Sequence, residues 1–230
     1  MKEAAEFHSE IAKKFDELYN ESPQFIERYE VWSKILERHV NLDAEVLDAG
    51  CGSGIFSFFL AKRGNLVSGV DGASEMIKIC KKKKEEQGLE NVSFKESYIP
   101  LSQDVFQKKF DVVISSSVLE YFENVPEIIG NFESFLKSNG TVIFSIPNKS
   151  GFYRRLERVI FKLTGRPKYL SFSKSSFTLN EFNEVMRQVG FELKEAEYFS
   201  SDRTFDKLFI SLLPRKYLTT LFLAVYQKSN

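Results

Sequence analysis

Cysteine is scarce in this chain of 230 residues, which contains only Cys51 and Cys80. Two isolated cysteines provide neither a disulfide framework nor the paired spacing of a zinc site, and they suit a reducing compartment. The first fifteen residues alternate charged and apolar side chains, unlike the continuous apolar stretch of a secretory signal. We therefore expect two free thiols and a cytoplasmic protein.

The sequence also lacks a long apolar run and an excess of one charge. Its most apolar late segment, 205–225, is interrupted at Asp206-Lys207 and at Pro214-Arg215-Lys216, and it falls short of the roughly 20 apolar residues that span a bilayer. Lys and Arg number 32, and so do Asp and Glu. Net charge therefore gives no general attraction to nucleic acid or to an anionic membrane. We expect no transmembrane segment and no nucleic-acid partner.

Short apolar runs alternate with amphipathic stretches from residue 45 onward. The expected strands are 46–47, 66–70, 92–94, 110–115 and 141–146, and the helices between them are 55–63, 74–87 and 125–137. Asn139-Gly140 is a C-cap signal for the last of these helices. Two helices, around 7–18 and over 25–39, are expected before the first strand. This alternation predicts a doubly wound α/β sheet with parallel strands.

Three glycines follow the first expected strand, in Asp48-Ala49-Gly50-Cys51-Gly52-Ser53-Gly54. Open α/β sheets bind ligands at such a strand-to-helix turn, and glycine lets the backbone approach the ligand. The spacing is G-x-G-x-G, and Ile55 follows, so the dinucleotide fingerprint G-x-G-x-x-G is not met and NAD is disfavoured. A tight turn that binds no ligand is the alternative.

Two carboxylates accompany the glycine turn. Asp71 ends the second expected strand, where a carboxylate can accept hydrogen bonds from both hydroxyls of a ribose. Asp48 lies beside the glycines, where it would repel a pyrophosphate and attract a cation. The pattern therefore indicates a nucleoside ligand that carries positive charge and no phosphate, a description that fits S-adenosylmethionine.

Further segments resemble class I S-adenosylmethionine-dependent methyltransferases over nearly the whole chain. Beyond the glycine turn and Asp71, the similar segments are Ser74-Glu75-Met76, 110–121 and 136–141. The resemblance implies a Rossmann-like sheet of seven strands, mostly parallel, with one antiparallel strand near the C-terminus and S-adenosyl-L-methionine as the cofactor. It also implies one domain over 1–230, with a helical cap (1–42), a cofactor-binding core (43–146), a lid inserted after the fifth strand (147–177), and a C-terminal helix and strands (178–230).

The resemblance assigns the cofactor site residue by residue. The implied cofactor-binding residues are Asp48, Gly50, Cys51, Gly52, Gly54, Asp71, Gly72, Met76, Ser97, Tyr98, Ser116 and Arg28. Ser97 and Tyr98 stand where the family often has an acid that binds the adenine amine. Three assignments have structural alternatives: Met76 as a core methionine, Ser116 as a strand-end hydroxyl, and Arg28 as a surface ion pair in place of a partner for the methionine carboxylate.

Glu120 and Tyr121 follow the fourth expected strand and are candidate catalytic residues, since a base would help to deprotonate an oxygen acceptor. A helix-start carboxylate and a packed aromatic ring are the alternatives. Ubiquinone-pathway O-methyltransferases, which resemble this segment, carry an acidic and histidine set here that can hold a metal. Only Glu120 remains as a strong ligand, so we predict no metal requirement. His8 and His39 lie in no recognisable motif and are interpreted as surface or core histidines.

Residues 147–177 form the most individual part of the chain, and an amphipathic helix is expected within them. Its apolar positions are Phe152, Leu156, Val159, Ile160 and Leu163, with Arg154, Arg155, Arg158 and Lys162 mostly elsewhere on the helix. We favour a helix that packs on the sheet edge with solvated arginines. Shallow docking of 151–163 on an anionic membrane is the alternative.

Several motifs that the chain lacks narrow the class of methyl acceptor. The chain has Ile146-Pro147-Asn148-Lys149 in place of the turn typical of DNA adenine methyltransferases, no cysteine after the fourth strand, and no paired-glutamate loop of protein arginine methyltransferases. We expect methyl transfer to an oxygen, or less so a nitrogen, of a small metabolite or lipid-like acceptor, by a monomer or homodimer. An RNA or protein methyltransferase and a non-catalytic nucleoside-binding module are the alternatives.

Overall fold

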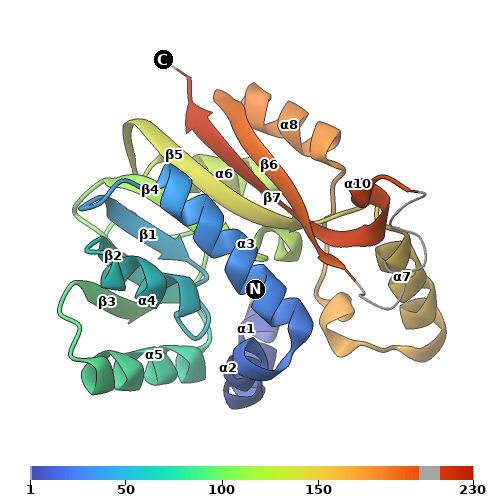
Figure 1. Ribbon diagram of the computed structural model, residues 1–230, viewed down its shortest axis with the longest axis horizontal. Coiled ribbons are helices and arrows are strands. Elements are labelled where there is room, and N and C mark those ends of the chain that lie inside the picture. Colours follow the sequence, from blue (N-terminus) through green and yellow to red (C-terminus); the bar gives the residue numbers. More distant parts are fainter. Residues whose placement is uncertain (1, 202–212, 230) are drawn as a thin grey trace.

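A seven-stranded sheet forms the centre of the computed structural model, which describes residues 2–201 and 213–229 (Figure 1). The strands lie in the order β3-β2-β1-β4-β5-β7-β6. Their bounds are β1 (Glu45–Ala49), β2 (Leu66–Asp71), β3 (Val92–Glu96), β4 (Phe110–Ser116), β5 (Leu136–Pro147), β6 (Phe191–Ser201) and β7 (Thr219–Lys228). β1 to β5 pair in parallel, and β7 runs antiparallel to both β5 and β6. The predicted mostly parallel sheet with one antiparallel strand is confirmed.

Helices cover both faces of this sheet. Their bounds are α1 (Lys2–Glu10), α2 (Ala12–Glu21), α3 (Pro23–His39), α4 (Ile55–Lys62), α5 (Ser74–Gln87), α6 (Val125–Glu133), α7 (Phe152–Thr164), α8 (Leu179–Gln188) and α10 (Arg215–Leu218), with 3₁₀ turns η1 (Leu119–Tyr121) and η2 (Lys168–Ser171). Apolar side chains of α3, α4 and α5 pack with one face of the strands, and those of α6 and α8 pack with the other. Trp32 of α3, fully buried, stacks on Phe56 of α4. Burying a side chain of this kind contributes about 1.5–3 kcal/mol.

Two predicted helices differ from the structure. The N-terminal stretch forms three helices where two are expected, because the first is interrupted at Ile11. The helix expected over 125–137 ends at Glu133, and β5 begins at Leu136. Phe135 and Leu136 are buried in the sheet core, which helix continuation would prevent. Asn139 and Gly140 are therefore part of the irregular start of β5 and do not cap α6.

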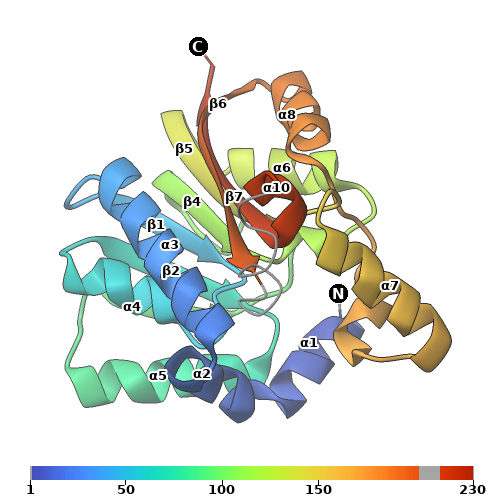
Figure 2. The same cartoon turned by 45° about the vertical axis from the view of Figure 1, so that its right-hand side comes forward.

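The strand order reverses between β1 and β4, and the carboxyl ends of β1, β2 and β4 lie at one edge of the sheet. In Figures 1 and 2, α1, α2 and α7 lie below this edge. The N-terminal helices and the segment after β5 therefore both cover it. Such a switch point is where open α/β sheets bind their ligands. No helix within 2–201 and 213–229 combines the length and apolar character needed to cross a membrane. The apolar segment 205–225 lies partly outside the described residues.

Candidate functional site

The glycine turn between β1 and α4 is fixed against the end of β2. The backbone N–H groups of Gly50 and Cys51 both donate to the carbonyl oxygen of Val70, at 2.8 and 2.9 Å. Gly50 has φ +80°, and a Cβ added there would lie 2.3 Å from Cγ2 of Val118. No side chain fits at this position, so the backbone approaches η1 closely.

Asp48 is buried beside this turn, and Asp71 is partly buried there. The carboxylate of Asp71 accepts hydrogen bonds from the N–H groups of Gly52 and Ala73, each at 2.8 Å, and burial raises its pKa. Asp48 is only 2% exposed and accepts a hydrogen bond of 2.6 Å from Ser57 Oγ. Burial, with a smaller contribution from the charge of Asp71, raises the pKa of Asp48 to about 7, although the Ser57 hydrogen bond opposes the shift. A bound cation would restore the ionised form of Asp48.

Two cavities that share wall residues open beside the turn. The larger has a volume of about 440 Å³ and is bordered by the predicted residues Arg28, Gly50, Gly52, Asp71, Gly72, Met76, Ser116, Glu120 and Tyr121. The smaller, of about 40 Å³, is bordered by Arg28, Asp48, Gly50, Cys51, Gly52 and Ser116. The fold thus brings most of the predicted site together from β1, β2, β4 and the N-terminal helices.

Three of the predicted cofactor-binding residues line neither cavity. Gly54 precedes α4 and has φ +80°. Ser97 donates its backbone N–H to the carbonyl oxygen of Asp71 at 3.0 Å, and Tyr98 is exposed with its ring against Gly72. Ile99, which is buried, is the residue of this segment that borders the larger cavity.

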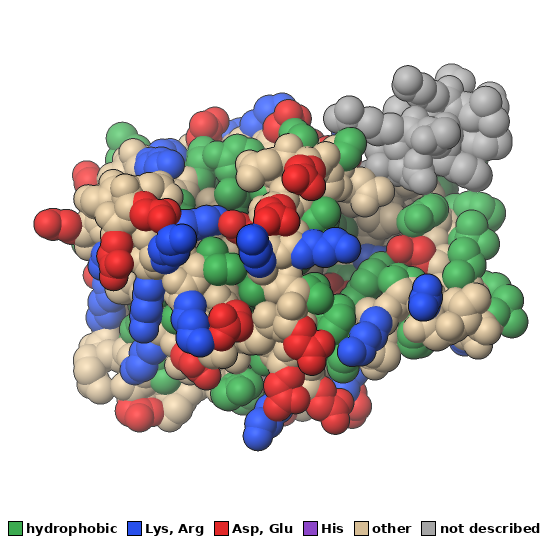
Figure 3. All heavy atoms as spheres, turned by 90° about the horizontal axis from the view of Figure 1, so that it is seen from below, with side chains coloured by type: hydrophobic (Ala, Val, Ile, Leu, Met, Phe, Trp, Pro, Cys, Tyr) green, Lys and Arg blue, Asp and Glu red, His purple; other side chains and the backbone are tan. Residues whose placement is uncertain are grey.

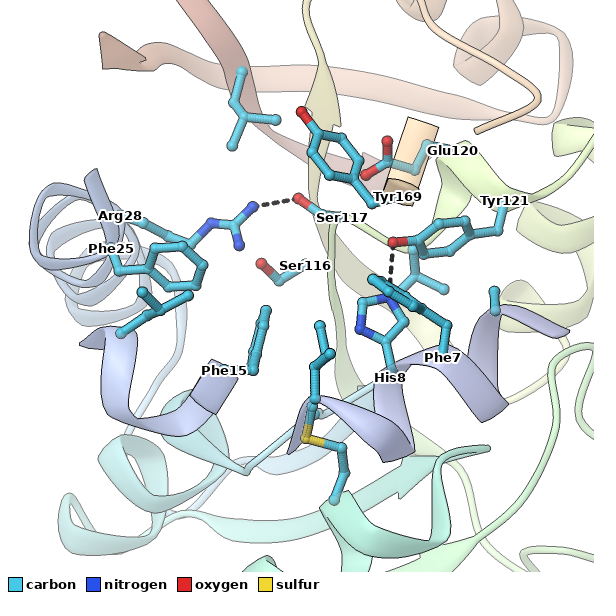
Figure 4. Close-up of a pocket in the computed structure, with 18 of the residues that line it drawn as sticks. Phe7, His8, Phe15, Phe25, Arg28, Ser116, Ser117, Glu120, Tyr121 and Tyr169 are labelled. Atoms are coloured by element: carbon cyan, nitrogen blue, oxygen red, sulfur yellow. Dashed lines mark hydrogen bonds between the residues drawn. The ribbon is translucent and has the colours of Figure 1, made fainter. Parts of the chain in front are cut away.

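Arg28 points into the cavity from α3, and the structure corrects its interpretation as a surface ion pair. Its Nη2 donates to Ser117 Oγ at 2.5 Å, and its guanidinium lies 5.7 Å from the ring centroid of Phe25 (Figure 4). Within the described part of the chain, no carboxylate forms an ion pair with Arg28. Met76 packs with Ala12 and Ala73, as expected of a core methionine, and it also borders the cavity, so its contact with adenine stays a prediction.

Glu120, Tyr121 and His8 form a polar group at the opposite side of the cavity from Arg28 (Figure 4). Nε2 of His8 and the hydroxyl of Tyr121 are 2.9 Å apart. Burial lowers the pKa of His8 and raises that of Tyr121 well above its ordinary value, so both side chains are neutral near pH 7. Glu120 is 6% exposed, and its Oε2 has no hydrogen-bond partner among the described residues. Burial raises its pKa, against the opposing charges of nearby arginines.

A hydrogen-bonded group of three residues in the segment after β5 also lines the cavity. Nη1 of Arg154 donates to Glu157 at 3.1 Å and to the hydroxyl of Tyr169 at 3.0 Å, and that hydroxyl donates to Glu157 at 2.9 Å. Arg154 is buried, and its Nε has no partner among the described residues. Arg154, which was expected to be solvated, therefore faces the cavity.

α1 and α2, part of the helical cap expected over 1–42, provide a wall of the cavity whose residues the sequence did not mark as site residues. Apolar residues of this wall and of the start of α3 are Ala4, Ala5, Phe7, Ile11, Phe15, Leu18 and Phe25. His8 belongs to the same wall, although the sequence led us to interpret it as a surface or core histidine. Its only sequence signal is its place on a helix that precedes the sheet, because no local motif marks it.

Both cysteines are buried free thiols, as predicted. The Sγ of Cys80 donates a hydrogen bond of 3.2 Å to the carbonyl oxygen of Gly52, which links α5 to the glycine turn. Over the described ranges, no group of three or more His, Cys, Asp or Glu side chains could hold a metal ion.

Comparison with known proteins shows which family this chain belongs to. A family model described as a methyltransferase domain matches residues 41–164, more than half of the chain. A ubiquinone biosynthesis O-methyltransferase of Coxiella burnetii is 33% identical over 119 residues, which are 51% of this chain and 50% of that protein. The protein of the same description from Actinobacillus pleuropneumoniae is 32% identical over 110 residues, 46% of this chain and 47% of that protein. The chain thus matches about half the length of these curated relatives.

Solved structures share the fold at lower identity. Magnesium protoporphyrin IX methyltransferase from Synechocystis PCC 6803, with bound S-adenosylhomocysteine, superposes with a TM-score of 0.66 at 20% identity, covering 88% of this chain and 82% of that one. The N-methyltransferase NodS from Bradyrhizobium japonicum gives a TM-score of 0.65 at 14% identity, covering 92% and 91%. At these identities the likeness shows the fold alone. With the family model covering the glycine turn, both carboxylates and the segment after β4, the chain belongs to the methyltransferase-domain family.

Proposed function

We propose that this chain is an S-adenosylmethionine-dependent methyltransferase that acts on an oxygen of a small, lipid-like acceptor. The observation that carries the proposal is the pair of carboxylates beside the glycine turn, Asp48 buried and Asp71 partly buried, with no room for a Cβ at Gly50. Asp71 would hold the ribose hydroxyls, and Asp48 and Arg28 would hold the ammonium and carboxylate of the methionine part. The cofactor supplies an electrophilic methyl group on a sulfonium.

The acceptor is inferred from the wall of the larger cavity. Phe7, Ile11 and Phe15 make one side of it apolar, while Glu120, Tyr121 and His8 place polar atoms at one end. A molecule with one hydroxyl on an aromatic or otherwise apolar body would match both surfaces. The relatives described as ubiquinone biosynthesis O-methyltransferases support an oxygen acceptor.

His8 and Tyr121 are proposed to take up the proton of the acceptor hydroxyl. As the oxygen–carbon bond forms and the carbon–sulfur bond breaks, the hydroxyl proton passes to the oxygen of Tyr121, whose own proton moves to Nε2 of His8. The 2.9 Å separation of these two atoms permits that transfer. The lowered pKa of His8 keeps its imidazole unprotonated, and therefore able to accept the proton, near pH 7.

The first test is isothermal titration of the full chain with S-adenosylmethionine, S-adenosylhomocysteine and NAD in parallel. We expect binding of the two adenosyl-sulfur ligands and none of NAD. Binding of NAD alone, or of no ligand, would contradict the proposal. Bound cofactor would then justify a screen with labelled methyl groups, in which phenols that carry an alkyl chain are compared with their methyl ethers as controls.

The same screen separates the alternatives. Transfer only to RNA or to a protein, with salt-sensitive binding to the polyanion in the RNA case, would replace the small acceptor. Cofactor binding without transfer to any acceptor would favour a non-catalytic nucleoside-binding module. In both cases the assignments of Asp48 and Asp71 would stand, because fold and cofactor do not determine the acceptor.

A further inference from the structure

The outward face of α7 is apolar and exposed. Leu156, Val159 and Ile160 are 43%, 54% and 44% exposed, and Leu163 is 81% exposed. The helical spacing of these four residues places them on one stripe of the helix. α7 does contact β7, but its apolar stripe is exposed, so the expected packing of the helix on the sheet does not cover this stripe. Exposed apolar patches of this kind mark interaction surfaces in soluble domains.

Basic side chains lie beside this stripe, and acidic ones do not. Arg155 and Lys162 are exposed, Arg158 is half-buried, and none of the three forms an ion pair with a carboxylate among the described residues. The one acidic residue of α7, Glu157, is turned toward the cavity, and its carboxylate accepts hydrogen bonds from Arg154 and Tyr169.

The charge of the whole segment is equally one-sided. Residues 147–177 contain eight Lys or Arg and one Asp or Glu, in a chain that is neutral overall. In Figure 3, hydrophobic side chains gather at the right-hand end of the molecule, and Lys and Arg side chains lie close to them. The outward surface of α7 thus combines exposed apolar groups with unpaired positive charge.

We propose that α7 docks this protein on the surface of an anionic phospholipid bilayer. A bilayer offers both complementary partners at once: anionic headgroups for Arg155 and Lys162, and an acyl boundary for the leucine and isoleucine side chains. A second copy meeting the same face would bring two basic segments together and would be opposed by their charge. At 13 residues the helix is about 20 Å long, too short to cross the bilayer core, so it lies in the interface plane.

Docking in this orientation has a consequence for the cavity, and this part rests on the proposed function. α7 turns Arg154 and Glu157 toward the cavity while its opposite face contacts the lipid. The cavity is therefore separated from the bilayer by a single helix. A lipid-like acceptor in the bilayer would then lie one helix away from the polar end of the cavity.

The test is flotation of the full chain with vesicles, which requires neither cofactor nor acceptor. Vesicles of phosphatidylcholine mixed equally with phosphatidylglycerol are compared with phosphatidylcholine alone, at low and high salt. We expect flotation with the anionic vesicles that weakens as salt rises. Replacing Leu156, Ile160 and Leu163 together by serine, or Arg155 and Lys162 together by glutamate, should each reduce the bound fraction by about tenfold.

Matched control variants change the same chemistry elsewhere on the surface. Leu42→Ser with Leu66→Ser removes exposed apolar groups, and Lys81→Glu with Lys84→Glu reverses charges on α5. Both should float like the unchanged protein. Thermal melting checks that each variant is folded. We expect wild-type melting, because the altered α7 side chains are exposed and support no core.

Three results would overturn the docking proposal. One is the absence of flotation with anionic vesicles. Another is flotation that survives both α7 variants. The third is a dimer that forms without lipid and is lost in the serine variant, which would assign the face to a second copy. A failure of cofactor titration would leave all three readouts unaffected, so the two proposals fail separately.

Discussion

Replacing Asp48 by asparagine is expected to stabilise the protein against unfolding above neutral pH. The carboxyl is 2% exposed, and its pKa is about 7 in the folded chain against an ordinary value of 3.8. Because the folded pKa is the higher one, the folded state binds more protons between these values, and stability falls as the pH rises through this range. The ionised group therefore destabilises the fold above pH 7.

The magnitude follows from the two pKa values. Each tenfold difference in the ionisation constant corresponds to about 1.4 kcal/mol, so a rise from 3.8 to about 7 costs about 4 kcal/mol above pH 7 and less than half of that at pH 5. Asparagine keeps an oxygen that can accept the Ser57 hydrogen bond, but its buried amide N–H groups need acceptors and cost about 1–3 kcal/mol. A net gain of about 1–3 kcal/mol is expected at pH 8.

The assay is urea unfolding of wild type and Asp48→Asn at pH 8 and pH 5, with Glu90→Gln as an exposed control. The cost of the amide is the same at both pH values, so the gain should shrink by roughly 2–3 kcal/mol at pH 5. A variant that gains nothing at pH 8 relative to pH 5 would refute the reasoning. The same variant should bind S-adenosylmethionine more weakly, because the negative charge opposite the ammonium is lost.

Four further substitutions test other parts of the site. Asp71→Ala removes two proposed ribose hydrogen bonds, each worth about 1.5–3 kcal/mol, and should weaken cofactor binding in titration calorimetry by a few kcal/mol; unchanged affinity would contradict the role of Asp71. His8→Phe and Tyr121→Phe should each lower kcat by about 10²–10⁴-fold with cofactor affinity unchanged, and the His8 variant should lose the rise of kcat with pH that a titrating base produces. A kcat that stays within a few-fold of wild type would exclude this proton path. Gly50→Ala combines a positive φ with a Cβ 2.3 Å from Val118, so a fall in melting temperature and loss of cofactor binding are expected together; a variant with wild-type values for both would show that the turn can move.

Local patterns predicted most of the sheet, because each strand carries its own signal. The bounds of α5 agree with the expected 74–87, and those of β2 differ by a single residue. Where prediction was wrong, a longer-range contact decided the outcome. α6 stops at Glu133 because Phe135 and Leu136 are buried beside the strands, which overrides the turn preference of Asn139-Gly140.

The sequence by itself was enough to predict the residues of the proposed cofactor site. The glycine turn, Asp48 and Asp71 lie within 24 residues of one another, on consecutive elements whose order sets their place at the sheet edge. Their chemistry follows from residue type and spacing, and the fold brings them together as expected.

Only the tertiary structure brings together the residues of the proposed acceptor side. His8 and Tyr121 are 113 residues apart in the chain, and no local pattern relates a residue of the first helix to one that follows β4. The direction of α7 was equally undetermined, since its sequence gives an apolar stripe and a basic one without saying which face the rest of the fold covers. Burial of Arg154 and exposure of Leu163 result from how α7 is positioned over the cavity, and such packing is a property of the whole chain.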